Sequence, residues 1–337
     1  LSNFSAGGSS PLEKHKKMNV VITTLNFTET ALSKLKEAGL NAWKYSGPAL
    51  GAGGSEDILY EAVKDADIII AGTETYSPSL LKRLHKLKLI SRNGIGYDAI
   101  DLKALKELGI GLTRTTGFVE GAVAEHVMAY ILYFARRIDA QNKSMHEHVW
   151  EPTLEPGAKG KTLALYGFGG IGKEIAKRAV PFKMNVIYYC RHPNLEDEKT
   201  YGVKYVDEET LLREGDFLSL NVPLTDSTFH LIDKNKLDQM KTGSILINIA
   251  RGPVIDEFAV ADALKSGKLG AAAVDVFPTE PCTNSPLANC PTAVLTPHTA
   301  SSTIENSAEM NIAAVDNVLN YLQGSLDNKY LVLKGVR

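Results

Sequence analysis

Three side chains in the C-terminal half of the chain have the types needed to hold an anion and to move a proton. Arg251 follows the apolar segment LINIA, Glu280 lies within VDVFPTEP, and His298 lies within LTPHTA. A guanidinium binds a carboxylate through two parallel hydrogen bonds, and an imidazole accepts and returns a proton near neutral pH. Taken singly, they are as readily explained as a surface arginine, a solvated acid and a structural histidine. Together they predict an acid–base site in which Glu280 stabilises the protonated His298.

A glycine-rich turn at Gly167, Gly169 and Gly172 predicts a dinucleotide site. It lies in LALYGFGGIGKEIAKR, which has the pattern of an apolar strand, a turn and the start of a helix. The first glycine permits the tight turn, the second lets a pyrophosphate approach the backbone, and the third lets helix and strand pack closely. A helix that begins near Ile171 would direct its free N–H groups at the phosphates. The same glycine spacing occurs in ordinary turns, and the flanking strand and helix favour the nucleotide.

The chain around these motifs alternates strands and helices from Met18 onward, which predicts an α/β fold with parallel sheets. In an open α/β sheet, ligands bind at the carboxyl ends of the strands. The glycine turn and the three polar side chains all lie where expected strands end. Besides the strand before the glycine turn, the expected strands cover residues 18–25, 40–45, 67–72, 86–92, 110–115, 184–190, 216–222, 243–250, 270–277 and 292–298.

A length of 337 residues is enough for two domains. An apolar segment without proline predicts one long buried helix from Val119 to Ile138, and a last helix at 305–324 is expected to return to the first domain. The expected parts are a disordered leader or tag at 1–17, a substrate domain at 18–118 plus 301–337, and a dinucleotide-binding Rossmann domain at 119–300.

Composition narrows the class of partner. The net charge of −2 gives no electrostatic reason to expect nucleic acid or an anionic membrane. No apolar run approaches the roughly 20 residues that span a bilayer. The three cysteines have neither the spacing of a metal site nor the even number of a disulfide framework. We therefore expect no bound metal, and we expect a reduced, cytoplasmic protein. The class of partner that remains is a small molecule.

The chain resembles the D-isomer-specific 2-hydroxyacid dehydrogenases, and most of all their D-3-phosphoglycerate dehydrogenase branch. The resemblance runs from Met18 to about Gly324, and its motifs occur in the family order. It implies two flavodoxin- or Rossmann-like domains with an active-site cleft between them, and an NAD(P)-dependent enzyme. The motifs are SRNGIGYDAID, AVAEH, GFGGIG, NVPLT, INIARGPVID, VDVFPTEP and TPHTA.

Residue roles follow from the resemblance at matching positions. It implies that His298 is the acid–base and Glu280 its orienting partner, while Arg251 binds the substrate carboxylate and polarises the carbonyl oxygen. Asp275 would hold the nicotinamide carboxamide. The backbone of Asn93, Gly94, Ile95 and Gly96 would bind the same substrate carboxylate. The implied cofactor-binding set is Gly167, Gly169, Gly170, Ile171, Gly172, Cys190, Arg191, His192, Val222, Pro223, Ala250 and Asp275.

Two departures from the family pattern concern the cofactor. Cys190 stands where an aspartate would bind the adenosine ribose, and Arg191 and His192 follow. Losing the carboxylate removes repulsion against a 2′-phosphate, and an arginine supplies a counter-charge. NADP is therefore slightly favoured, with NAD as the alternative if Arg191 points to solvent. Gly170 stands where many relatives have an arginine. The loss of that arginine would weaken cofactor binding without changing which cofactor binds.

Two further positions bear on the substrate and on the oligomeric state. Ala71 falls near the phosphate-binding arginine of some phosphoglycerate dehydrogenases. A non-phosphorylated 2-keto acid such as glyoxylate, hydroxypyruvate or pyruvate is at least as plausible as phosphoglycerate chemistry. A non-catalytic, nucleotide-sensing binding module is the alternative of a different class, and the three intact polar residues favour catalysis. The family's helix at the position of 119–138 lies at a twofold interface, which implies a homodimer.

Overall fold

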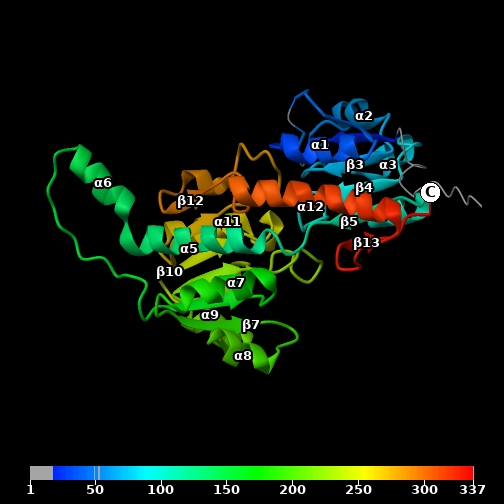
Figure 1. The fold of residues 1–337 in the computed structure, drawn as a ribbon. Helices are drawn as coiled ribbons and strands as arrows, with labels where there is room; N and C mark the ends of the chain where they lie inside the picture. Colours follow the sequence, from blue (N-terminus) through cyan, green and yellow to red (C-terminus); the bar gives the residue numbers. More distant parts are fainter. Residues whose placement is uncertain (1–17, 49, 52–53, 337) are drawn as a thin grey trace, which may run out of the picture. The chain divides into compact units, whose positions relative to one another are not determined.

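The computed structural model describes residues 18–48, 50–51 and 54–336, and they form two compact units. The first unit contains the described residues up to Val119 and from Thr303 onward, and the second contains Glu120–Ser302. The expected leader at 1–17 lies outside the described residues. Each unit is an α/β sheet, as Figure 1 shows.

The first unit has a sheet in the order β13-β5-β4-β3-β1-β2. From β2 to β5 this is the 2-1-3-4-5 order of flavodoxin-like sheets, and all of these strands are parallel. Only β13 runs antiparallel, beside β5. The elements are β1 (Asn19–Ile22), α1 (Glu29–Glu37), β2 (Asn41–Lys44), α2 (Glu56–Val63), β3 (Ile68–Ala71), α3 (Pro78–Arg83), β4 (Leu89–Arg92), α4 (Leu102–Leu108), β5 (Gly111–Arg114), α12 (Ile304–Gln323) and β13 (Leu331–Leu333).

Helices cover both faces of this sheet. One core packs residues of α2, α3 and α4 against the strands, and the other packs α1 and α12. The long helix α12, orange to red in Figure 1, contacts α1 and the strands β3, β4 and β5. The C-terminal helix thus belongs to the first unit although residues 120–302 separate it from the rest of that unit.

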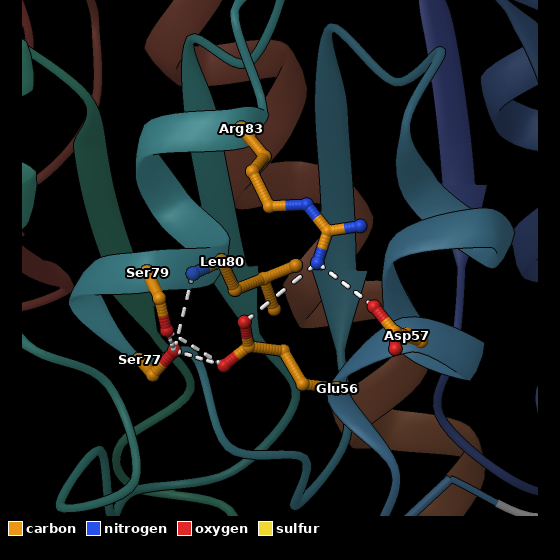
Figure 2. A network of polar contacts seen from close by, with 6 residues as sticks. All are labelled: Glu56, Asp57, Ser77, Ser79, Leu80 and Arg83. Atoms are coloured by element: carbon orange, nitrogen blue, oxygen red, sulfur yellow. Dashed lines mark hydrogen bonds and ion pairs between the residues drawn. The ribbon is translucent and has the colours of Figure 1, made fainter.

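A polar network joins α2 to α3 in the first unit (Figure 2). The Ser77 hydroxyl accepts a hydrogen bond from the Leu80 N–H at 3.1 Å and so caps α3. Ser77 and Ser79 both donate to the Glu56 carboxylate, and Arg83 forms an ion pair with Asp57 at 3.0 Å. A cap of this kind contributes about 1 kcal/mol, whereas solvent-exposed ion pairs contribute little. The network serves the fold of the first unit.

The second unit has a sheet in the order β12-β11-β10-β9-β6-β7-β8. From β8 to β11 this is the 3-2-1-4-5-6 order of dinucleotide-binding sheets, extended by β12. The elements are α5 (Glu120–Arg136), α6 (Ile138–His146), β6 (Thr162–Tyr166), α7 (Gly170–Ala179), β7 (Asn185–Tyr189), α8 (Leu195–Tyr201), β8 (Lys204–Tyr205), α9 (Glu208–Glu214), β9 (Phe217–Leu220), α10 (Lys234–Gln239), β10 (Ser244–Asn248), a 3-10 turn (Gly252–Val254), α11 (Glu257–Lys265), β11 (Leu269–Val274), a 3-10 turn (Pro286–Asn289) and β12 (Ala293–Leu295).

The expected α/β class with parallel sheets is confirmed, and one helix prediction needs correction. The segment from Val119 to Ile138 is not one helix, because α5 ends at Arg136 and α6 begins at Ile138. Arg137 has φ 45° and ψ 41°, a left-handed conformation that interrupts the right-handed helix. Helix α6 buries none of its side chains and extends away from the sheet of its own unit (Figure 1).

Candidate active site

Glu280 and His298 form a hydrogen-bonded pair in the second unit. His298 Nδ1 lies 2.6 Å from Glu280 Oε2, and Glu280 Oε1 accepts from the Phe277 N–H at 3.0 Å. Both carboxylate oxygens therefore have a partner. Because Nδ1 faces the carboxylate, Nε2 is the ring nitrogen that can exchange a proton with a substrate, and the His298 side chain is 35% exposed.

The surroundings of Glu280 keep its carboxyl ionised. Burial is the largest single influence on the pKa of Glu280 and raises it. The hydrogen bond and charge of His298, the Phe277 N–H and the Arg251 charge together outweigh burial and hold the pKa of Glu280 below its ordinary value of 4.5. An ionised carboxylate beside Nδ1 stabilises the imidazolium and fixes the orientation of the ring. The pair can thus deliver a proton from Nε2 and take it back.

The turn that carries His298 is fastened to Asp275, the residue after β11. Asp275 is 1% exposed, and its carboxylate accepts from the Thr296 hydroxyl at 2.5 Å, the Thr299 N–H at 2.8 Å and the Ala300 N–H at 2.9 Å. The His298 N–H donates to the Asp275 carbonyl at 2.8 Å. His298 has φ 54°, which is costly for a residue with a side chain. These bonds offset that cost and hold the imidazole in place.

The segment that carries Arg251 is positioned by Asn248 and Gly252. Asn248, fully buried at the end of β10, accepts from the Ala250 N–H at 3.1 Å and donates to the Arg251 carbonyl at 3.0 Å. A Cβ on Gly252 would lie 2.0 Å from the main-chain carbon of Phe277, so the two segments touch through their backbones. Strands β10, β11 and β12 are neighbours. The segments of Arg251, Glu280 and His298 therefore lie together at the carboxyl ends of these three strands.

The glycine turn between β6 and α7 fits a dinucleotide. Gly167 has φ 96°, and a Cβ there would lie 2.7 Å from the Asn221 carbonyl oxygen. A Cβ on Gly172 would lie 2.7 Å from the Gly167 carbonyl oxygen, which is the close packing of helix on strand that the spacing predicts. A Cβ on Gly169 would meet nothing within 4 Å, so the backbone there is open to a pyrophosphate. Helix α7 begins at Gly170, beside the expected start at Ile171.

The other predicted cofactor residues follow the strands on either side of β6 and the strand β10. Val222 and Pro223 come after β9, and Ala250 comes after β10. Cys190 follows β7 and is half-buried, and burial raises the pKa of its thiol, so this side chain is uncharged near neutral pH. Arg191 and His192 after it are exposed.

In the first unit, the segment of Asn93, Gly94, Ile95 and Gly96 follows β4. Within the described parts of the chain, the N–H groups of Gly94, Ile95 and Gly96 have no hydrogen-bond acceptor. Gly94 has φ 150°, and a Cβ there would meet the Arg92 guanidinium at 2.6 Å. Successive N–H groups without an internal acceptor can together bind an anion. This is the property that binding of a carboxylate requires.

Three supporting residues were not among the sequence predictions. Asn248 and Gly252 position Arg251, and Thr296 links Asp275 to the Tyr130 hydroxyl of α5. The available signals were a polar residue within the apolar run INIA and a glycine between Arg251 and Pro253. Neither signal specifies a partner. Among the residues that the structure describes, no helix is long and apolar enough to cross a membrane, and no cluster of side chains is arranged to hold a metal ion.

Comparison with known proteins gives the class. Residues 128–300 match the family model of the D-isomer specific 2-hydroxyacid dehydrogenase, NAD binding domain. The chain is 40% identical over 279 residues to a glyoxylate reductase of Thermococcus litoralis, covering 80% of this chain and 84% of the relative. It is 33% identical over 307 residues to a D-3-phosphoglycerate dehydrogenase of Archaeoglobus fulgidus, covering 90% of this chain and 57% of the relative.

A solved structure of a protein from Thermus thermophilus is similar throughout, with a TM-score of 0.83, 32% identity, and coverage of 94% of this chain and 100% of that one. The chain belongs to the D-isomer-specific 2-hydroxyacid dehydrogenase family. It is an NAD(P)-dependent oxidoreductase that transfers a hydride between the dinucleotide and a D-2-hydroxy acid and 2-keto acid pair.

Proposed function

We propose that the protein reduces a small, unphosphorylated 2-keto acid, with NADPH as its preferred cofactor and His298 as its acid. The observation that carries this proposal is the 2.6 Å contact between His298 Nδ1 and Glu280 Oε2, because it leaves Nε2 to exchange the substrate proton. A reduced, cytoplasmic setting fits the three free cysteines Cys190, Cys282 and Cys290.

The proposed mechanism gives each side chain one task. The Arg251 guanidinium binds the substrate carboxylate and polarises the C2 carbonyl oxygen. The dinucleotide, when bound, supplies the hydride to C2 or accepts it in the reverse direction. Protonated His298 donates its Nε2 proton to the C2 oxygen during reduction, and neutral His298 removes the hydroxyl proton during oxidation. Glu280 stabilises the imidazolium, and the N–H groups of residues 94–96 are proposed to bind the same carboxylate.

The proposed residues for the dinucleotide divide by the part they would bind. The turn of Gly167, Gly169 and Gly172 would bind the pyrophosphate, with Gly170 and Ile171 supplying the first N–H groups of α7. Cys190, Arg191 and His192 would bind the adenosine ribose. The choice of NADPH rests on an uncharged Cys190 and an exposed Arg191. The remaining proposed contacts are Val222, Pro223, Ala250 and Asp275.

The unphosphorylated substrate is proposed from the first unit and from the relatives. Ala71 occupies the position near which some phosphoglycerate dehydrogenases have an arginine for the phosphate. Arg92, the nearby basic residue, already donates to the Asn93 carbonyl. The Thermococcus relative is named for glyoxylate. 3-Phosphoglycerate chemistry and a nucleotide-sensing module without activity are the competing possibilities.

A substrate panel tests this proposal. Initial rates at 340 nm are compared for glyoxylate, hydroxypyruvate, pyruvate and phosphohydroxypyruvate, each with NADH and NADPH. We expect an unphosphorylated acid with NADPH to react fastest. A preference for phosphohydroxypyruvate would support 3-phosphoglycerate chemistry, and no oxidation of either cofactor would support the sensing module.

Arg191→Ala should lower the NADPH preference by roughly tenfold, because it removes the counter-charge of the 2′-phosphate. Lys199→Ala is the control.

Replacing Glu280 with glutamine should lower kcat for reduction less than the loss of His298 does, and should change the pH profile of the reaction. The amide carries no negative charge, so it cannot stabilise the imidazolium as the carboxylate does. Glu257→Gln is the matched control, and an unchanged profile for Glu280→Gln would contradict the pairing of Glu280 with His298.

The same carboxylate also affects stability. Because the folded-state pKa of Glu280 is lowered, its carboxylate stabilises the fold above pH 4.5. This stabilisation is lost as the pH falls through the folded-state pKa.

We propose that the protein is a homodimer in which α6 and the segment after it lie at the interface. Large apolar side chains are exposed there, and Trp150 is 77% exposed; the others are Ile138, Met145, Val149 and Leu154. Helix α6 buries no side chain within its own chain. Exposed apolar groups this close together in the sequence are typical of an interface between subunits.

The double variant Met145→Ser and Trp150→Ser should dissociate such a dimer, because it removes exposed apolar area from the proposed interface. Light scattering after size exclusion should show the mass of a dimer for the wild type and of a monomer for the variant. Phe258→Ser is the control, since Phe258 is also exposed but lies on α11. A wild-type protein that is monomeric at micromolar concentration would rule the dimer out.

A further inference from the structure

A chain of two side-chain amides joins the C-terminal helix α12 to the start of the segment 93–96. Asn311 of α12 donates from Nδ2 to the Asn26 carbonyl oxygen at 3.1 Å. Its Oδ1 accepts from Asn93 Nδ2 at 3.0 Å. Asn311 is 1% exposed and Asn93 is 9% exposed, so neither amide is open to bulk water. The bonds of the Asn93 amide are made by Nδ2, and its buried Oδ1 has no hydrogen-bond partner among the described residues.

The chemistry of the first partner sets the orientation of both amides. A main-chain carbonyl oxygen can only accept, so the NH₂ end of Asn311 must face Asn26. The oxygen end of Asn311 then faces Asn93, which must present its own NH₂ end. Asn93 Nδ2 also lies 3.2 Å from the Thr24 hydroxyl, a second acceptor on the same side. A flipped Asn93 would place two amide oxygens against each other.

The main chain of Asn93 is fixed at the same time. Its N–H donates to the Ala71 carbonyl at 3.0 Å, and its carbonyl accepts from the Arg92 guanidinium. The three N–H groups that follow, at Gly94, Ile95 and Gly96, have no acceptor among the described residues. The residue that precedes these three N–H groups is therefore held by both its main chain and its side chain.

We propose that Asn311 is a positioning residue for the substrate carboxylate, acting through Asn93. It keeps the N–H groups of Gly94, Ile95 and Gly96 at the spacing that a carboxylate needs, although 218 residues separate it from Asn93 in the sequence. This inference rests on the proposed function of the segment 93–96. It gives the C-terminal helix a part in binding the keto acid and none in binding the dinucleotide.

Asn317 offers a matched control on the same helix. It is an asparagine of α12, 2% exposed, whose Nδ2 donates to the Arg114 carbonyl at 3.0 Å. It therefore resembles Asn311 in residue type, burial and bond to a main-chain carbonyl. It makes no hydrogen bond to Asn93. Alanine at either position should lower the melting temperature by a similar amount, and only Asn311→Ala should affect the keto acid.

The experiment measures KM for the preferred keto acid, kcat, and the dissociation constant of NADPH. Asn311→Ala should raise KM roughly tenfold, as expected for a contact that fixes a binding group, with NADPH affinity unchanged. Asn317→Ala should leave KM at the wild-type value. In a double-mutant cycle, Asn311→Ala should add nothing to Asn93→Ala, because the two residues act in series.

Other results would overturn the inference. Equal effects of Asn311→Ala and Asn317→Ala on KM would show that general loosening of α12 is responsible. Additive effects of Asn311→Ala and Asn93→Ala would show that Asn311 does not act through Asn93. These failures differ from failure of the proposed function, in which the wild-type enzyme itself reduces none of the keto acids.

Discussion

Replacing His298 with alanine should lower kcat for keto-acid reduction by roughly 10³-fold, the range expected when a general acid is lost. Glu280 orients the imidazole through the 2.6 Å contact between Glu280 Oε2 and His298 Nδ1. The Thr296 hydroxyl and the Thr299 N–H hold the turn that carries His298 by donating to Asp275. The Asp275 bonds to Thr296, Thr299 and Ala300 do not involve the imidazole, so the turn should survive the substitution. Affinity for NADPH should therefore change little.

Stopped-flow or steady-state rates give kcat, and quenching of protein fluorescence gives the NADPH dissociation constant. His230→Ala is the matched control. His230 is also a histidine with positive φ, at 47°, in the same unit, but it is exposed and stacks on Phe229. Near-normal turnover in His298→Ala would remove His298 from the mechanism, and loss of turnover in both variants would point to a general effect on the fold.

The parts of the site that could be predicted from the sequence are those with a local cause. Gly167 is required by the turn, where its φ is 96°, and Gly172 is required by its close approach to the Gly167 carbonyl oxygen five residues earlier. The strand pattern was equally local, because buried parallel strands are apolar runs such as Ile68–Ala71. Glu280 and His298 were each recognisable as titratable groups after a strand, since parallel strands place such groups at one edge.

The parts that could not be predicted depend on contacts between distant segments. Asp275 holds the turn of His298 through three donors that lie 21 to 25 residues further along the chain. Asn311 contacts Asn93 only because α12 returns to the first sheet. The left-handed Arg137 has no signal in composition, because arginine is a good helix former. The antiparallel strand β13 has only three residues and no periodicity to read.

Replacing Gly252 with alanine should destabilise the second unit by about 1–3 kcal/mol, the usual cost of forcing atoms into a packed site. The new Cβ would lie 2.0 Å from the Phe277 carbon and 2.2 Å from the Pro278 nitrogen. Both are main-chain atoms, so no side-chain rotation relieves the contact. The segments after β10 and β11 must move apart, and each carries a proposed catalytic residue, Arg251 or Glu280. We therefore expect kcat/KM to fall roughly 10²-fold or more, since misplacement of about 1 Å has that effect.

Gly169→Ala separates the effect of crowding from that of losing a glycine. Gly169 has φ −83°, which alanine adopts readily, and its Cβ would meet nothing within 4 Å. Its melting temperature should equal that of the wild type, while NADPH affinity falls because the methyl group occupies the space proposed for the pyrophosphate. Thermal unfolding and kcat/KM are measured for both variants. If Gly252→Ala retained wild-type stability and activity, the segments of Arg251 and Glu280 would not be in backbone contact, and the proposed coupling of their positions would fail.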